Sequence, residues 1–157
     1  MFLVKVRTIF SAAHRLCRPG FSDEENFALY GKCSSPNGHG HNYELEVAVA
    51  GEVDPHTGMV ANFYDINRLI DDLIYEKVDH RNLNTDVDFM RGIIPTAENM
   101  AKVFWETLEP HVEGGTLFSI TIGERGNNVV TYYGPRVSID ELRRMPDGAH
   151  TVVRSLN

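Results

Sequence analysis

Two long segments of this 157-residue chain alternate apolar and polar side chains, which constrains the fold more than any other feature. In the first segment, one face carries the apolar residues Phe2, Val4, Val6 and Phe10. In the second, the apolar positions are Tyr43, Leu45, Val47 and Val49. A period of two is typical of a half-buried β-strand. We therefore expect two strands near the N-terminus, each with one face toward a core.

The middle of the chain changes to a helical period. Between Ile66 and Val78, apolar residues recur at spacings of three and four, with charged residues on the other side. A second helix is predicted after Pro95, with Thr96 as its N-cap and Glu98 in its first turn, where a carboxylate suits the helix dipole.

Two further strands close the pattern. Phe118, Ile120 and Ile122 share one face of residues 116–124, and a turn at 126–128 leads into a last strand. The order β-β-α-α-β-β predicts an α+β fold, with an antiparallel four-stranded sheet and two helices on one of its faces.

Charge and hydropathy exclude several classes of protein. The net charge of -7, from 15 basic and 22 acidic side chains, argues against a general nucleic-acid binder. No apolar run approaches the roughly 20 residues that span a bilayer. We expect a single globular unit in the cytoplasm, with Cys17 and Cys33 reduced and without a nucleic-acid or membrane partner.

Three histidines are candidates for a metal site. His39 and His41 are two residues apart, so in a strand their side chains point to the same face. His14 ends the first strand, and antiparallel pairing would bring it beside them. Three neutral imidazoles leave a fourth position for water or substrate, which is typical of catalytic zinc. The alternative is a polar, glycine-rich turn.

Four other residues are candidates for a catalytic or binding role. Cys33 lies near the histidines and is a candidate base or nucleophile, an inert thiol or a fourth zinc ligand. Asp79 is adjacent to His80 and can orient its ring, although a helix-end histidine is the simpler interpretation. Glu124 ends an apolar row, which indicates either a ligand anchor or a solvated strand end.

With these residues, the chain resembles the 6-pyruvoyl-tetrahydropterin synthase family. The resemblance is carried, in order over about residues 4–134, by "SAAHRL", "KCSSPNGHGHNY", "DHRNLN", "TAEN" and "GNNVVTYYG". The spacing Cys-x5-His-x-His resembles the pyruvoyl branch. A spacing of Cys-x3-His-x-His would indicate the 6-carboxy-tetrahydropterin synthase of the queuosine pathway.

The resemblance implies a tunnelling fold (T-fold), whose subunits join strand edges and assemble as two trimers into a homohexamer with active sites between subunits. It implies a lyase of tetrahydrobiopterin biosynthesis that uses Zn²⁺, with Mg²⁺ supporting activity. The substrate would be 7,8-dihydroneopterin triphosphate, converted to 6-pyruvoyl-tetrahydropterin with elimination of triphosphate. The alternatives are the carboxy-tetrahydropterin synthase and a non-catalytic protein that binds zinc or pterin.

The family's site residues carry over to matching positions. The zinc ligands would be His14, His39 and His41. Cys33 would be the general base, with Asp79 and His80 as its relay. Glu124 would anchor the pterin ring, and Thr96 would line the same pocket.

The resemblance also divides the chain. Residues 1–134 would form the pterin synthase domain, and residues 135–157 a C-terminal extension beyond the family's usual end, with a short helix in 138–144. The triphosphate would be neutralised by basic residues near the motifs, with candidates Arg15, Arg18, Lys32, Lys77 and Arg81.

Overall fold

The computed structural model describes residues 1–135, 137, 138, 140 and 144. Its strands are β1 (Phe2–His14), β2 (His39–Gly51), β3 (Arg81–Asn82), β4 (Thr116–Arg125) and β5 (Asn128–Tyr132). Its α-helices are α1 (Asp23–Tyr30), α2 (Phe63–Ile70), α3 (Glu76–Val78) and α4 (Ala97–Leu108). Short 3₁₀ turns occupy Gly31–Ser34, Asp88–Met90 and Glu109–His111. The helix expected in 138–144 falls largely outside the described residues.

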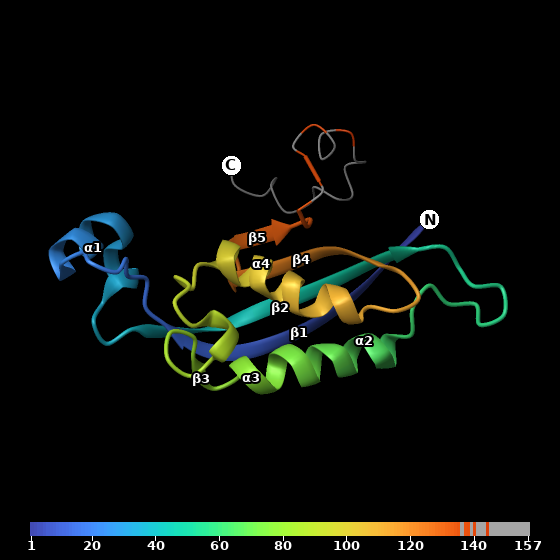
Figure 1. The fold of residues 1–157 in the computed structure, drawn as a ribbon, viewed down its shortest axis with the longest axis horizontal. Coiled ribbons are helices and arrows are strands. Elements are labelled where there is room, and N and C mark those ends of the chain that lie inside the picture. Colours follow the sequence, from blue (N-terminus) through green and yellow to red (C-terminus); the bar gives the residue numbers. More distant parts are fainter. Residues whose placement is uncertain (136, 139, 141–143, 145–157) are drawn as a thin grey trace.

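The strands form one sheet in the order β3-β1-β2-β4-β5. The four long strands pair antiparallel, as predicted, and α2 and α4 lie along one face of the sheet (Figure 1). The fifth strand, β3, has two residues and runs parallel to the end of β1. The α+β prediction is therefore confirmed, with one short strand added.

The segment between β1 and β2 contains the helix α1, which the apolar periodicity of the sequence does not predict. This helix is stabilised at its start: the Ser22 hydroxyl accepts the Glu25 N–H, and the Glu25 carboxylate accepts the Ser22 N–H. Among its eight residues only Asn26 is buried. Periodicity misses such a helix because it has no apolar stripe, whereas the capping pair was visible in the sequence.

The predicted middle helix is continuous but changes its winding. A π-helical segment, Asp71–Tyr75, joins α2 to α3. Along the whole helix from α2 to α3, buried residues recur at a spacing of four: Ile66, Ile70, Ile74 and Val78. Wider turns keep a spacing of four in line, since an α-helix has only 3.6 residues per turn. None of the helices in the described residues is long and apolar enough to cross a membrane.

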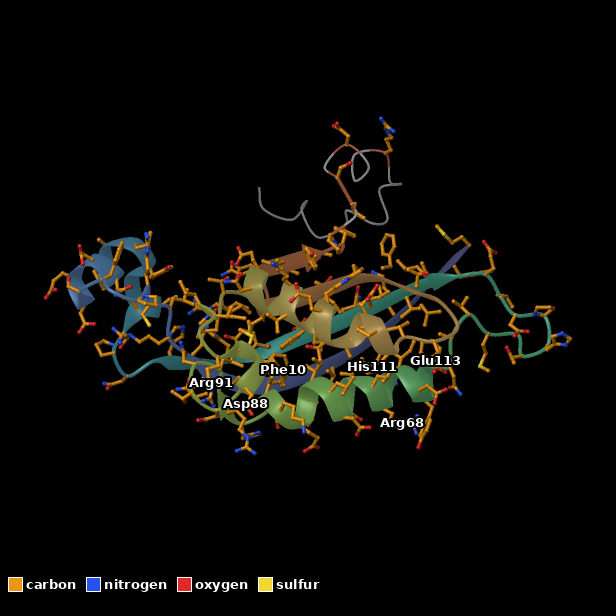
Figure 2. The ribbon with its side chains drawn as sticks, viewed as in Figure 1. Phe10, Arg68, Asp88, Arg91, His111 and Glu113 are labelled. Atoms are coloured by element: carbon orange, nitrogen blue, oxygen red, sulfur yellow. The ribbon has the colours of Figure 1, made fainter. Side chains whose placement is uncertain are left out.

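The core lies between the sheet and these helices. Phe10 of β1, labelled in Figure 2, stacks on Tyr43 of β2 with ring centroids 5.1 Å apart, and its ring also contacts that of Phe104 of α4. One prediction about this core is wrong: Leu117, not Phe118, packs into it. The register of β2 and β4 shifts by a bulge at this level, which reverses the alternation.

Candidate metal centre

Strand pairing brings the three histidines together. In the register of β1 and β2, His14 lies directly opposite His39. The ring of His14 is 4.6 Å from that of His39 and 5.2 Å from that of His41, measured between centroids. The convergence predicted from the strand ends is therefore what the structure has.

The proton on His14 is fixed by a backbone carbonyl. Its Nδ1 lies 2.9 Å from the carbonyl oxygen of Pro95, the residue that precedes the N-cap of α4. A carbonyl can only accept, so Nδ1 donates and Nε2 presents a lone pair. This lone pair faces the other histidines, with 3.1 Å between Nε2 of His14 and Nε2 of His39.

Burial favours the neutral form of the His14 and His41 rings. Desolvation lowers the pKa of His14, partly offset by its hydrogen bond to Pro95. Desolvation also lowers the pKa of His41, partly offset by the charge of Glu124. Neutral imidazoles are the form that ligates metal ions.

Glu124 of β4 joins the cluster. Its Oε1 lies 3.3 Å from Nε2 of His14 and 3.2 Å from Nε2 of His41. One ligand atom from each of the four side chains falls within 4.8 Å of the others. The sequence indicates either a ligand anchor or a solvated strand end for Glu124, and it does not predict the contacts with His14 and His41.

The cluster fits a metal ion. Although Nε2 of His41 is close to Glu124, the contact lacks the direction of a hydrogen bond. Within the described part of the chain, this nitrogen and Nδ1 of His39 are buried without a hydrogen-bond partner. Three imidazoles and one carboxylate form a donor set suited to a divalent ion.

Tyr43 extends the site, and sequence reasoning placed it only in the core. It meets the ring edges of His14 and His41 at centroid distances of 5.9 and 5.5 Å. Its buried hydroxyl has no hydrogen-bond partner among the described residues. Burial, followed by the charges of Glu124 and Cys33, raises the pKa of Tyr43. The available signal was its position, two residues after His41 on the same face.

Asp79 and His80 form a separate pair. Nδ1 of His80 lies 2.6 Å from Oδ2 of Asp79, while Oδ1 accepts the backbone N–H of Ser11 at 2.8 Å. This backbone donor, then the hydrogen bonds from His80 and Tyr75, lower the pKa of Asp79. His80 has a φ of 57°, an uncommon conformation outside glycine, and its N–H donates to the carbonyl of Ser11. Sequence reasoning missed both Ser11 and Tyr75.

The remaining predicted residues, Cys33 and Thr96, lie outside the histidine cluster, in a 3₁₀ turn and at the start of α4. Cys33 is half-buried in a 3₁₀ turn, and its carbonyl accepts the N–H of Leu16. Thr96 caps α4 as predicted, because its hydroxyl accepts the N–H of Asn99. In the described part of one chain, no hydrogen bond joins Cys33 to the Asp79–His80 pair.

Fold and site together define an α+β protein with a His₃Glu centre for a metal ion at one end of its sheet. Residues 3–135 match the sequence profile described as 6-pyruvoyl tetrahydropterin synthase, and the chain belongs to that family. It is accordingly a T-fold enzyme.

Three relatives illustrate the similarity. The human protein named 6-pyruvoyl tetrahydrobiopterin synthase is 44% identical over 131 residues, which are 83% of this chain and 90% of the human one. The structure of the Caenorhabditis elegans 6-pyruvoyl tetrahydropterin synthase has a TM-score of 0.77 and 41% identity, covering 85% of this chain and 97% of its own. A putative 6-carboxy-5,6,7,8-tetrahydropterin synthase from Archaeoglobus fulgidus is 34% identical over 108 residues, or 68% of this chain and 76% of its own. The pyruvoyl synthases are thus the more similar branch.

Proposed function

We propose that this enzyme converts 7,8-dihydroneopterin triphosphate to 6-pyruvoyl-tetrahydropterin and eliminates triphosphate, in the synthesis of tetrahydrobiopterin. The observation that carries the proposal is the His₃Glu centre, which lies in a chain 44% identical to a named pyruvoyl synthase. The Cys-x5-His-x-His spacing favours this activity over the carboxy-tetrahydropterin synthase.

The proposed metal is Zn²⁺, held by His14, His39 and His41. Three imidazole nitrogens and the partly exposed carboxylate beside them support this choice. When bound, Zn²⁺ supplies Lewis acidity, which draws charge from the side-chain hydroxyls of the substrate and acidifies the neighbouring C–H bonds. The protein then has to position the pterin and move protons.

We assign proton transfer to Cys33, as a base that takes a proton from the side chain of the substrate and returns it. His80 is the proposed relay. Asp79 holds its ring by the 2.6 Å contact and remains a carboxylate because its pKa is lowered by Ser11. Thr96 and Glu124 are the proposed pterin contacts, since Thr96 follows the proline whose carbonyl holds His14.

A homohexamer is proposed for the active form, with sites between subunits. The sheet face opposite α2 and α4, here called the open face, lines a cavity that includes Leu3, Ile9 and Val129. These apolar side chains are 41%, 61% and 36% exposed in the single chain. The side chain of His80 is 82% exposed and is thus available to a neighbouring subunit's Cys33. Edge pairing would also cover strands that otherwise favour aggregation.

The decisive experiment incubates the purified enzyme with 7,8-dihydroneopterin triphosphate and identifies the products. We expect triphosphate and 6-pyruvoyl-tetrahydropterin, while release of acetaldehyde without 6-pyruvoyl-tetrahydropterin would establish the carboxy-synthase chemistry. Pterin binding without turnover would instead establish a binding protein.

Residue roles need variants with a matched control. Cys33→Ala should abolish turnover, whereas Cys17→Ala should preserve it, because both thiols are free and half-buried but only Cys33 has a proposed role. Equal turnover in the two variants would disprove the base assignment. Mixed assemblies of the Cys33→Ala and His80→Ala chains should regain activity if the two residues meet across subunits. Mixed assemblies that form but stay inactive would indicate that Cys33 and His80 act together within one chain.

A further inference from the structure

Three separations among the four ligand atoms match those of a metal site that includes Glu124. Zinc–nitrogen and zinc–oxygen bonds of about 2.0–2.1 Å in a tetrahedron place neighbouring donors about 3.3–3.4 Å apart. Nε2 of His14 lies 3.1 Å from Nε2 of His39 and 3.3 Å from Oε1 of Glu124. The same carboxylate oxygen is 3.2 Å from Nε2 of His41. These three separations are close to the edges of such a site, and the remaining pairs of ligand atoms lie within 4.8 Å.

Hydrogen bonding does not account for the position of Glu124. The proton of a neutral His14 is on Nδ1, which donates to Pro95, so Nε2 has none to offer Oε1. Nε2 of His41 has no hydrogen-bond partner in the described residues despite its closeness to the same oxygen. The Nε2 lone pair of His14 therefore faces the carboxylate of Glu124, an arrangement that a cation between them stabilises.

We propose that Glu124 is the fourth ligand of the metal ion in the substrate-free enzyme and that it gives up this position when the pterin binds. The closed state protects the ion, and its opening creates the vacant position that a catalytic site needs.

The fold gives Glu124 the freedom that this exchange requires. It is the next-to-last residue of β4, where the pairing with β5 is irregular between Gly123 and Arg125. Its side chain is 23% exposed, whereas that of His14 is 1% exposed. The exchange rests on the proposed function, because the departing carboxylate becomes free to accept the N–H groups of the pterin ring.

The first test measures Zn²⁺ affinity by competition with a chelator in Glu124→Gln and Glu44→Gln. Glu44 is the matched control: it pairs with Gly123 in the register, is exposed, and lines the open face. Losing a direct ligand should weaken Zn²⁺ binding by about tenfold or more, since even outer-shell partners contribute that much. Glu44→Gln should equal the wild type. Equal affinities in the two variants would overturn the ligand assignment.

The second test uses Co²⁺-substituted protein, and its deciding measurement is made on the wild type, so that measurement does not depend on the folding of a variant. Its visible absorption bands should change on addition of neopterin, which lacks the triphosphate, and Glu124→Gln should abolish that change. A wild-type spectrum that neopterin leaves unaltered would overturn the exchange. Absence of triphosphate release would reject the proposed function alone, because neither metal measurement depends on turnover.

Discussion

Replacing Tyr43 with Phe removes one buried hydroxyl and keeps the packing of the ring. The stacking on Phe10 and the edge contacts with His14 and His41 do not involve the hydroxyl. A buried polar group without a partner costs about 1–3 kcal/mol. We therefore expect the metal-free variant to be about 1 kcal/mol more stable than the metal-free wild type, which raises the Tm by about 2–4 °C at this size.

The same change should reduce activity. Because its pKa is raised, the phenol of Tyr43 keeps its proton and is a donor beside the histidine cluster. A hydrogen bond to a charged group is worth about 1.5–3 kcal/mol, so if this hydroxyl donates to charge that develops on the substrate, its loss would lower kcat about tenfold or more. Stability and activity would then change in opposite directions, as is common where function places a polar group in a core.

Urea denaturation and calorimetry after removal of metal by a chelator measure the first effect, and steady-state kinetics of the metal-loaded enzyme measure the second. Tyr64→Phe is the control, because Tyr64 is 70% exposed and its stability should change by less than about 0.5 kcal/mol. If Tyr43→Phe destabilises the metal-free protein while Tyr64→Phe does not, the hydroxyl has a stabilising partner and the reasoning is refuted.

Two further predictions concern residues that support the site. Gly38→Ala should weaken Zn²⁺ binding about tenfold or more, because the added Cβ would lie 2.9 Å from the carbonyl oxygen of His14 and displace the start of β2. Gly20 also has a positive φ but open surroundings, so Gly20→Ala should leave the Zn²⁺ affinity measured by chelator competition unchanged. Asp79 has a lowered pKa in the folded state, so its stabilising effect is present above its unfolded value of 3.8 and is lost as the pH falls through the lower folded value. Asp79→Asn should therefore make the free energy of unfolding, measured by urea denaturation, fall less steeply as the pH is lowered. An unchanged dependence on pH would contradict the Ser11 hydrogen bond as the cause of the lowered pKa.

The sequence was sufficient for the strand pairing that builds the histidine cluster. Alternation established which side chains share a face, and the antiparallel pairing of two consecutive strands then placed His14 opposite His39. The helix α4 was equally readable, since Thr96 carries its cap signal and its apolar face is wide.

Other parts were not readable because they depend on contacts between distant segments. The proton position on His14 is set by the carbonyl of Pro95, 81 residues away. A bulge reversed the faces of Leu117 and Phe118, and no local pattern marks its position. Glu124 was found as a residue of interest, but its neighbours are supplied by two other strands.

The proposed site has a buried part, which holds the metal ligands, and an exposed part, which moves protons. The two parts are supported in different ways. The histidine cluster is held by paired strands and is largely buried, with His14 1% exposed. The Asp79–His80 pair is held through Ser11 of β1 and through Tyr75, and the side chain of His80 is 82% exposed. A metal site needs fixed donor positions, which a sheet provides. A proton relay needs access to the substrate and to Cys33, so its exposure in a single chain is what the proposed assembly of subunits requires.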